Sequence, residues 1–453
     1  MPAEQANDVR GDRAQDGHEV AGDLDPVRAL QHKLYRAAKQ CRSRRFHALF
    51  DKVHRKDVLW AAWSEVARNG GAPGVDGVTI GSIEQAGVGC FLDELHAELG
   101  EGRYRPLPVR RVTIPKRAGG ERHLGVPCVR DRVVQAAWKL VVEPVFEAGF
   151  ADVSFGFRPR RSAHQARERI RAGLRQGRRW VVDADIKGFF DHLDHGLLGA
   201  MLRERVSDRR VMDLVAGWLR AGVLAGEQLL HPDAGTPRGG VASPLLANVY
   251  LDRLDQAWQA DYRRLGELTR YADDLVIVCA TRERAEAALA ALERLLAELG
   301  LELAAAKTRI VDLRTPDQGF DFLGYHFRML PTKGNPRRTY AACWPSRPAM
   351  TAARDRVRAL TSPDRIGRPA IVVVGEVNRF LKGWGAYFRH GNSTRQFHHL
   401  DQFVFDRLAR FIARKHGSRN WRRGMIDLVE SRTTLGLYRL AGTVRYASAH
   451  ATR

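Results

Sequence analysis

A pair of adjacent aspartates inside an apolar segment constrains the fold of this chain more than any other feature. The motif YADD at residues 271–274 leads directly into LVIV at 275–278, which predicts a tight hairpin between two short hydrophobic strands. Two carboxylates at the tip of such a hairpin repel each other, and a divalent cation relieves that repulsion. An isolated Asp-Asp pair would also fit a solvated turn, so its interpretation depends on the rest of the chain.

A third carboxylate precedes this pair in a similar apolar strand. The segment VVDADI at residues 181–186 predicts a β-branched strand that delivers Asp185 to its end, just before KGFF at 187–190. Three carboxylates on two neighbouring strands can hold two Mg²⁺ ions ~3.5–4 Å apart, an arrangement that supports in-line phosphoryl transfer. The sequence therefore predicts a two-metal site, and the solvated-turn interpretation becomes the weaker one.

The charge of the chain is large, positive and unevenly distributed. The 453 residues carry 74 Lys and Arg against 52 Asp and Glu, a net charge of +22 with an isoelectric point near 10.4. Residues 1–25 have a net charge of −5, whereas residues 333–453 hold 24 Lys and Arg against seven Asp and Glu, a net of +17. Positive charge concentrated in this way predicts a nucleic-acid surface in the C-terminal quarter.

The apolar and cysteine content favours a reduced, globular protein. With 44% apolar residues, the chain is long enough for two or three domains that have cores of their own. The sequence has no apolar leader and no run of ~18 apolar residues, so we expect a cytoplasmic protein without a membrane span. Five cysteines occur without a C-x-x-C pair, which argues against a disulfide framework and a structural zinc site. They are Cys41, Cys90, Cys128, Cys279 and Cys343.

Hydrophobic periodicity predicts an α+β chain in three parts. Residues 1–25 are expected to form a disordered acidic tail, residues 26–330 a domain of strands and helices, and residues 331–453 a basic helical domain. A Pro/Arg/Thr-rich connection is expected after Pro331. A hairpin is predicted over 108–127, further strands over 179–186, 269–279 and 308–327, and helices within 26–68 and over 130–147, 208–224, 242–257 and 282–299.

Two apolar stripes with basic neighbours mark the C-terminal helices. Apolar residues recur at steps of three or four from Val374 to Phe388 and from Phe397 to Phe411, which predicts the packing faces of two helices. Basic residues beside such stripes are usually solvated. Because this region carries +17, we instead expect them to contact phosphates. The expected RNA-binding residues are Arg379, Lys382, Arg389, Arg407, Arg410, Arg414 and Lys415.

An ordered series of motifs resembles a known family. The motifs are NGGAPGVDG at 69–77, IPK at 114–116, GGER at 119–122, FGFRP at 155–159, DIK at 185–187, FFD at 189–191, GTPRGG at 235–240, SPLLAN at 243–248, YADD at 271–274, KT at 307–308, FDFLGY at 320–325, LKGW at 381–384 and YF at 387–388. Together they resemble the reverse transcriptases encoded by group II introns, the reverse transcriptase/maturase family. The resemblance runs from about Asn69 to Tyr446, and the order of so many motifs makes it specific.

The resemblance implies a right-hand polymerase fold. Fingers and a palm with a ferredoxin-like sheet would be followed by an α-helical thumb or maturase domain. Asp185, Asp273 and Asp274 would be catalytic and would hold two Mg²⁺ ions, with Ile186 in the same metal site and Mn²⁺ as a substitute metal. These metals would lower the pKa of the primer 3′-hydroxyl and stabilise charge on the leaving pyrophosphate. The residues and the resemblance thus lead to the same prediction for the carboxylates.

Five further residues are implied to bind the nucleotide. Lys116 and Arg122 flank the Gly-Gly turn of a fingers hairpin over the triphosphate, although template phosphate is an alternative partner. Phe190 would exclude ribonucleotides at the sugar C2′, or simply pack in the core. Lys307 would be a general acid near the pyrophosphate, or form a surface salt bridge. Arg238 departs from the glutamine of the family, and this longer, charged side chain could strengthen triphosphate binding or obstruct the sugar.

The expected function is that of an RNA-directed DNA polymerase that also acts as a splicing maturase and supports retromobility. Its partners would be structured group II intron RNA, an RNA/DNA primer–template and dNTPs, with nucleoid association when it acts on DNA. Phe322, Leu323, Gly324 and Tyr325 resemble the primer-grip turn, in which Gly324 allows a close backbone approach.

Two alternatives stay open. One is an RNA-binding splicing maturase with weak polymerase activity, which Arg238 motivates, and the other is a free-standing enzyme of repair or defence. No paired cysteines of an HNH nuclease follow Asp274, so no endonuclease domain is expected. The sequence leaves open which intron and target site are involved, and whether the protein is a monomer or a dimer.

Overall fold

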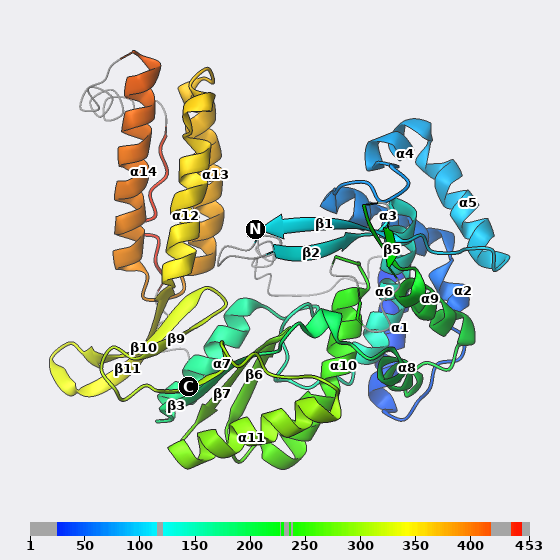
Figure 1. Ribbon diagram of the computed structural model, residues 1–453, viewed down its shortest axis with the longest axis horizontal. Helices are drawn as coiled ribbons and strands as arrows, with labels where there is room; N and C mark the ends of the chain where they lie inside the picture. The colour runs from blue at the N-terminus through cyan, green and yellow to red at the C-terminus, as the bar shows by residue number, and fades with distance from the viewer. Residues whose placement is uncertain are drawn as a thin grey trace. The chain divides into compact units, whose positions relative to one another are not determined.

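The computed structural model describes residues 25–115, 121–226, 228–230, 235–236, 239–417 and 436–445. The predicted acidic tail thus lies almost entirely outside the described residues. Contacts divide the chain into two compact units, which are described separately below. Within the described residues, the larger unit comprises residues 25–170 and 182–310, and the smaller comprises residues 171–181, 311–417 and 436–445. Figure 1 labels the helices and strands of both.

The larger unit begins with helices that pack around α6. This helix, Val129–Glu147, buries residues on all sides, including Val133, Trp138 and Val141, and it contacts α1 and α3. Its bounds confirm the helix predicted at 130–147. The other helices of this part are α1 (Pro26–Gln40), α2 (Phe50–Val53), α3 (Lys56–Asn69), α4 (Ile80–Ala86), α5 (Val88–Gly100), α8 (His195–Arg203) and α9 (Arg209–Arg220). Helix α9 is shorter than predicted because the chain enters a strand at Val223.

A small sheet lies beside these helices. The predicted hairpin is confirmed: β1 (Val109–Pro115) pairs antiparallel with β2 (Glu121–Val126). Strand β1 also pairs in parallel with β4 (Val223–Ala225), which in turn pairs with β5 (Gln228–Leu230). The strand order is therefore β2-β1-β4-β5. This sheet links the 109–126 hairpin to a segment that lies about a hundred residues later in the chain.

A second sheet has the ferredoxin-like topology that the resemblance implies. Its strands are β3 (Trp180–Asp185), β6 (Glu267–Tyr271), β7 (Asp274–Cys279) and β8 (Arg309–Asp312), in the order β6-β7-β3-β8. Helix α10 (Ser243–Ala257) precedes β6, and α11 (Arg282–Glu298) connects β7 to β8 and packs on β7. The resulting βαββαβ order with β3 and β7 at the centre confirms an α+β fold. Helix α7 (Ala163–Arg175) precedes β3.

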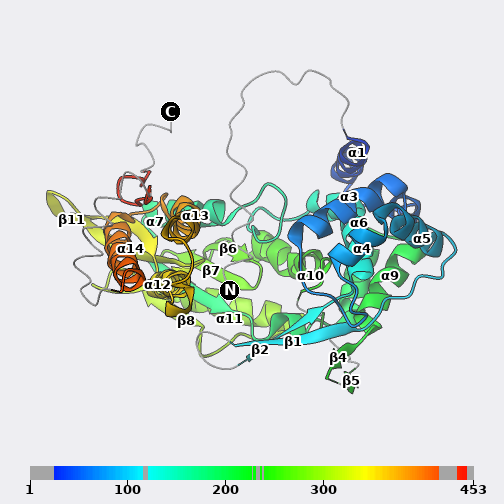
Figure 2. The ribbon, with the colours of Figure 1, turned by 90° about the horizontal axis from the view of Figure 1, so that it is seen from above.

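The smaller unit combines a three-stranded sheet with long helices. Strands β9 (Gly319–Phe322), β10 (Tyr325–Thr332) and β11 (Asn335–Pro345) lie in the order β11-β10-β9. Helices α12 (Arg347–Leu360), α13 (Ala370–Phe388) and α14 (Thr394–Lys415) contact one another and lie side by side (Figures 1 and 2). Their predicted apolar stripes are confirmed, since Val374, Leu381, Phe397 and Leu408 are buried.

One predicted connection is wrong. The Pro/Arg/Thr-rich stretch after Pro331 does not lead directly to helices, because it forms the end of β10 and all of β11. Strand β11 is exposed at Tyr340, and the small residues that follow at its C-terminal end, Ala341, Ala342 and Cys343, are all buried. The expected domain boundary at residue 331 falls inside β10, whereas the contacts group β9, β10 and β11 with the C-terminal helices.

The cysteines are free thiols, as the sequence predicts. Cys128, Cys279 and Cys343 are buried, and Cys41 and Cys90 are exposed. Within the described residues, no helix is both long enough and apolar enough to cross a membrane.

Candidate active site

The YADD motif forms the predicted tight turn between β6 and β7. Tyr271 pairs with Asp274 at the end of the ladder, so Ala272 and Asp273 are the two turn residues. Ala272 has a φ of 56°, in the left-handed region that is unfavourable for a residue with a Cβ. The turn is therefore strained, and such strain persists only where neighbouring groups hold the backbone in place.

The FGFRP motif supplies the backbone that packs on this turn. Arg270 N donates to Val153 O at 2.8 Å and Phe155 N donates to Arg270 O at 2.9 Å, so the segment runs alongside β6. A Cβ on Gly156 would lie 2.5 Å from Ala272 N and 3.1 Å from the carbonyl carbon of Tyr271. Glycine is required here because only a residue without a side chain lets the two backbones approach so closely.

A fully buried polar network forms hydrogen bonds to the backbone of the turn. Arg270 is 1% exposed and forms an ion pair with Asp255, which is 0% exposed. Its Nη1 donates to Ala272 O and to Asn248 Oδ1, both at 3.1 Å. Asn248 Nδ2 in turn donates to Gly156 O at 2.9 Å. The network thus connects α10, the FGFRP segment and the YADD turn through buried hydrogen bonds.

No sequence motif identified these three residues as a network. Arg270 precedes the apolar strand that follows the YADD turn, and Asn248 and Asp255 lie among the apolar residues of α10. Buried polar groups are nearly always hydrogen-bonded to one another, so polar residues at such positions are a usable signal. The sequence alone could not pair them, because Arg270 and Asp255 meet only when α10 packs on β6.

Strand β3 delivers Asp185 to its end, as predicted. Lys307 Nζ lies 2.6 Å from Asp185 Oδ2, and Arg309 Nε lies 3.2 Å from Asp183 Oδ2. Ala304 N donates to Asp185 O at 2.8 Å, and the buried Ile186 forms an isolated bridge with Leu303. The chain that follows α11 thus brings two cations to two carboxylates of β3.

The three predicted catalytic carboxylates interact electrostatically. Burial and, to a lesser degree, the negative charges of Asp273 and Asp185 raise the pKa of Asp274 to about 7, and the positive charge of Lys307 opposes this rise. A divalent cation relieves repulsion of this kind. Among the described residues, no three His, Cys, Asp or Glu side chains form a preformed metal cage.

Phe190 lies against part of the GTPRGG segment. Gly188 has a left-handed φ of 55°, and Phe189–Asp191 then form a single 3₁₀ turn. Phe190 is half-buried, whereas Phe189 is fully buried, so Phe189 is the core residue of the pair. Thr236 N donates to Phe190 O at 2.7 Å and Gly235 N donates to Leu193 O at 2.8 Å. Two segments that the resemblance assigns to nucleotide binding are thereby brought together.

The remaining nucleotide-binding candidates are less completely described. Lys116 and Arg238 lie outside the described residues. Arg122 belongs to β2, where it pairs with Ile114 along the backbone, and its side chain is likewise outside the description. Their roles therefore stay predictions of the resemblance.

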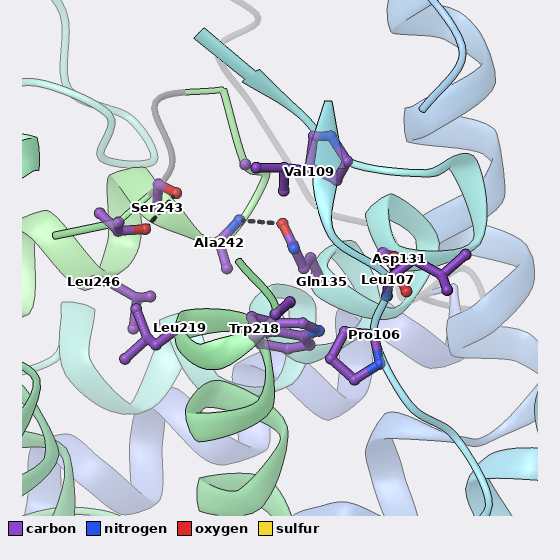
Figure 3. Close-up of a pocket in the computed structure, with 14 residues that line it drawn as sticks. Pro106, Leu107, Val109, Asp131, Gln135, Trp218, Leu219, Ala242, Ser243 and Leu246 are labelled. Carbon is purple, nitrogen blue, oxygen red and sulfur yellow. Dashed lines mark hydrogen bonds between the residues drawn. The ribbon is translucent and has the colours of Figure 1, made fainter. Parts of the chain in front are cut away.

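A pocket behind the 235–246 segment shows how this part of the chain is held. Gln135 of α6 accepts a hydrogen bond from Ala242 N at 3.3 Å, which Figure 3 shows. It also accepts one from Val241 N at 2.8 Å. Thr236 Oγ1 and Ser243 Oγ lie 2.9 Å apart. Asp131, one turn before Gln135, also lines this pocket. Gln135, which no sequence motif identified, thus fixes the segment just before α10.

The predicted primer-grip residues form the turn between β9 and β10 of the smaller unit. Leu323 and Gly324 have φ values of 50° and 76°, and positive φ at both central residues is typical of a type I′ hairpin turn. Tyr387 Oη donates to Leu323 O at 2.9 Å, and Ser346 N donates to Gly324 O at 2.8 Å. Phe322 and Tyr325 are buried, so only the backbone of this turn is available to a ligand.

The predicted RNA-binding residues fall into two groups. Arg379, Lys382, Arg410 and Arg414 are exposed. Arg407 instead donates to Thr361 O and Oγ1 at the end of α12, at 3.1 and 3.2 Å. Lys415 Nζ donates to Ile366 O and Arg368 O, both at 3.0 Å. The half-buried Arg389 accepts a hydrogen bond from Arg445 N on its carbonyl.

The sheet, the turn and the helices define a reverse transcriptase with a C-terminal helical domain. Residues 114–327 match the family described as "Reverse transcriptase (RNA-dependent DNA polymerase)", and residues 350–426 match "Group II intron, maturase-specific domain". The chain belongs to the family of group II intron-encoded reverse transcriptases and maturases.

Several known proteins are similar to this chain. Protein YkfC of Escherichia coli (strain K12) is 35% identical over 339 residues, which cover 66% of this chain and 87% of YkfC. Group II intron-encoded protein LtrA of Lactococcus lactis subsp. cremoris is 34% identical over 237 residues, which cover 51% of this chain and 39% of LtrA. Among solved structures, a chain of the "Partial Cas6-RT-Cas1--Cas2 complex" has a TM-score of 0.34 and 24% identity, and the match covers 55% of this chain and 41% of that one.

Proposed function

We propose that this protein copies RNA into DNA by two-metal nucleotidyl transfer and binds group II intron RNA as a splicing maturase. The observation that carries the polymerase half is the convergence of Asp185 from β3 with Asp273 and Asp274 from the β6–β7 turn. Strands β3 and β7 are neighbours in one sheet, and the charges of Asp273 and Asp185 add to the effect of burial in raising the pKa of Asp274.

Each part of the site has a chemical task in this proposal. Asp185, Asp273 and Asp274 hold two Mg²⁺ ions, and Arg270 fixes the turn on which two of these ligands lie. When bound, the metals lower the pKa of the primer 3′-hydroxyl and neutralise charge on the reacting phosphates. Lys307, released from Asp185, donates a proton to the leaving pyrophosphate. Phe190 bounds the sugar of the dNTP, beside the segment that contains Thr236.

The maturase half rests on the charge of the C-terminal helices. Arg379, Lys382, Arg410 and Arg414 are exposed, and residues 333–453 carry a net charge of +17. Exposed arginines on packed helices would contact the phosphates of folded RNA and recognise its shape rather than its sequence. The relatives described as intron-encoded proteins support intron RNA as this partner, with retromobility as the outcome of combining both halves. Five free thiols fit action in the reducing cytoplasm.

Primer extension tests the polymerase half. The wild type should extend oligo(dT) on poly(rA) with dTTP and Mg²⁺, and Asp273→Ala should not, because the metal site loses a ligand. Asp194→Ala serves as a matched control, since this aspartate caps α8 and takes no part in the proposed site. The polymerase proposal would be contradicted if the wild type did not extend the primer, or if the Asp273→Ala variant still extended it.

A splicing assay separates the two halves. We expect the Asp273→Ala variant to promote splicing of its intron RNA at the wild-type rate, because the RNA-binding helices do not include the metal site. A combined Arg379→Ala/Arg410→Ala variant should lose splicing and keep primer extension on short templates. Splicing that is insensitive to these arginines would contradict the maturase proposal as placed on these helices.

A further inference from the structure

An exposed aromatic side chain lies beside the catalytic turn and has no role in the proposed mechanism. Phe157 of the FGFRP motif is 46% exposed, although phenylalanine is usually buried. Its ring centroid lies 6.5 Å from that of Tyr271, the first residue of the YADD turn. The two side chains thus bring aromatic surface to the immediate neighbourhood of Asp273 and Asp274.

The backbone of Phe157 is strained. Its φ is 57°, and three residues later Arg160, which is also exposed, has a φ of 59°. Left-handed backbone is unfavourable for side chains with a Cβ, and for a bulky ring it marks a genuine outlier. Backbone strain of this kind clusters at functional sites, where it holds a residue in the conformation that binds the ligand.

The side chain between these two residues maintains the strain. Arg158 is 7% exposed and forms an ion pair with Glu147, with Nη2 2.7 Å from Oε1. Its Nη1 donates to Ala151 O at 2.6 Å and to Ser154 O at 2.9 Å. Because these contacts fix the buried Arg158 side chain, they keep Phe157 and Arg160 at the surface in left-handed conformations.

The position of Phe157 relative to the carboxylates is also fixed. Gly156 lies in backbone contact with the turn, and Asn248 holds Gly156 O within the buried network. Phe157 therefore cannot move without the catalytic turn. Proteins bind single bases by stacking them on exposed aromatic rings and bind the phosphates with nearby basic side chains. Phe157 and Arg160 provide such a ring and such a side chain close to the predicted catalytic site.

We propose that Phe157 is a stacking platform for a base of the primer–template at the catalytic turn, with Arg160 as a phosphate contact beside it. This inference rests on the proposed function, because it assumes that the nucleic acid reaches the YADD turn. The FGFRP motif then has two roles. Gly156 packs against the backbone of the YADD turn, and Phe157 stacks on a base of the substrate.

Equilibrium binding of a fluorescein-labelled RNA-template/DNA-primer duplex tests the inference. Anisotropy is measured with the full chain in Mg²⁺ without dNTP, at several KCl concentrations. Phe157→Ala should weaken binding about 5- to 150-fold, the range for loss of one stacked base, with no change in salt dependence. Phe157→Tyr should bind within threefold of wild type, because the ring is retained. Arg160→Ala should lower the slope of log K against log salt by about 1.

Two controls keep the test independent of folding. Trp60 is 47% exposed on α3, which lies away from β6 and β7 in both ribbon views, and Trp60→Ala should leave binding unchanged (Figures 1 and 2). Phe157→Gly should raise the Tm of the free protein while weakening binding, because glycine relieves the left-handed strain.

The outcomes separate this inference from the proposed function. Binding by Phe157→Ala within twofold of wild type, or a lower Tm for Phe157→Gly, would overturn the stacking platform. A wild type that binds the duplex tightly through Phe157 but does not extend the primer would contradict the polymerase proposal alone. Normal extension together with unchanged binding by Phe157→Ala would contradict the platform alone.

Discussion

At the scale of single residues, the catalytic turn is defined by how closely two backbones meet. Ala272 is held in a left-handed conformation, and Gly156 lies against it with no room for a side chain. This close backbone contact positions Asp273 and Asp274 together with the buried Arg270, which donates to Ala272 O. Adding a single methyl group at this contact should therefore displace the carboxylates of the proposed metal site.

Gly156→Ala should both destabilise the protein and slow primer extension. The added Cβ would lie 2.5 Å from Ala272 N, so the turn or the FGFRP segment must shift. We expect a loss of about 1–3 kcal/mol in the free energy of unfolding, as for other overpacked sites. Urea unfolding and extension rates measure the two effects.

Gly89→Ala is the matched control for that substitution. Gly89 lies within helix α5, and a Cβ there would meet nothing within 4 Å. Alanine favours the helix, so this variant should gain up to about 1 kcal/mol and extend primers normally. Equal effects of the two substitutions would contradict the close-contact explanation.

The buried carboxyl of Asp131 should make stability depend on pH. Burial raises its pKa to about 6, although the Tyr104 hydroxyl and Leu107 N–H donate to it and oppose the rise. The folded state therefore binds this proton more tightly than the unfolded state, where the pKa is about 4. Its contribution to stability is greatest below about pH 4 and is lost as the pH rises towards 6.

Asp131→Asn removes this titration. Relative to wild type, the free energy of unfolding of the variant should increase by about 2 kcal/mol between pH 4 and pH 7. Weakening the hydrogen bond with Tyr104 would lower the free energy of unfolding equally at every pH. It would therefore not change how the free energy of unfolding depends on pH. Parallel pH curves for the two proteins, measured by urea unfolding, would show that Asp131 has an ordinary pKa.

At the scale of elements, a buried ion pair joins α10 to β6. Arg270→Met should cost about 3–5 kcal/mol of stability, because Asp255 is left buried without its partner. Adding Asp255→Leu should restore most of that loss, since a buried pair can be replaced by apolar residues. Primer extension should stay impaired in the double variant, because Ala272 O and Asn248 still lack their donor.

The exposed pair of Arg253 and Glu204 provides the comparison. These side chains are 63% and 55% exposed, so Arg253→Met should change neither stability nor extension measurably. Recovery of extension together with stability in the Arg270→Met/Asp255→Leu variant would show that the network only stabilises the fold and does not position the turn.

The sequence predicted the elements that periodicity and turn chemistry specify. The strand ending at Asp185, the YADD turn, the 109–126 hairpin and α6 were all anticipated, because each depends on local pattern. The network of Arg270, Asn248 and Asp255 was not, since it forms between segments whose packing no local pattern encodes. Strand β11 was missed because its arginines and prolines resemble those of a loop, and its short buried run of Ala341, Ala342 and Cys343 lacks the alternation typical of a strand.

The basic helices illustrate the same limit. Charge and spacing identified Arg407 and Arg410 equally, yet the structure binds Arg407 to Thr361 at the end of α12 and exposes Arg410. A helical wheel cannot distinguish a cation that reaches a neighbouring carbonyl from one that meets solvent. Only the packing of α12 on α14 separates them.

At the scale of the whole molecule, the net charge of +22 should make RNA binding strongly salt-dependent. Arg410→Ala should lower the slope of log K against log salt by about 1 and leave Tm unchanged. Arg407→Ala should lower Tm, because two hydrogen bonds to Thr361 are lost, and should change the slope little. Filter binding and thermal unfolding of both variants test this division, which fails if the two residues behave alike.

The most direct test of the central claim is single-turnover addition of one dNTP to an RNA-templated DNA primer. Wild type is compared with Asp185→Asn, Asp273→Asn and the control Asp194→Asn, and duplex binding is measured in parallel. We predict that the first two variants lose about a thousandfold or more in rate while binding the duplex within threefold of wild type, and that the control reacts normally. A rate for Asp185→Asn or Asp273→Asn within tenfold of wild type would contradict the assignment of these carboxylates to a two-metal polymerase site.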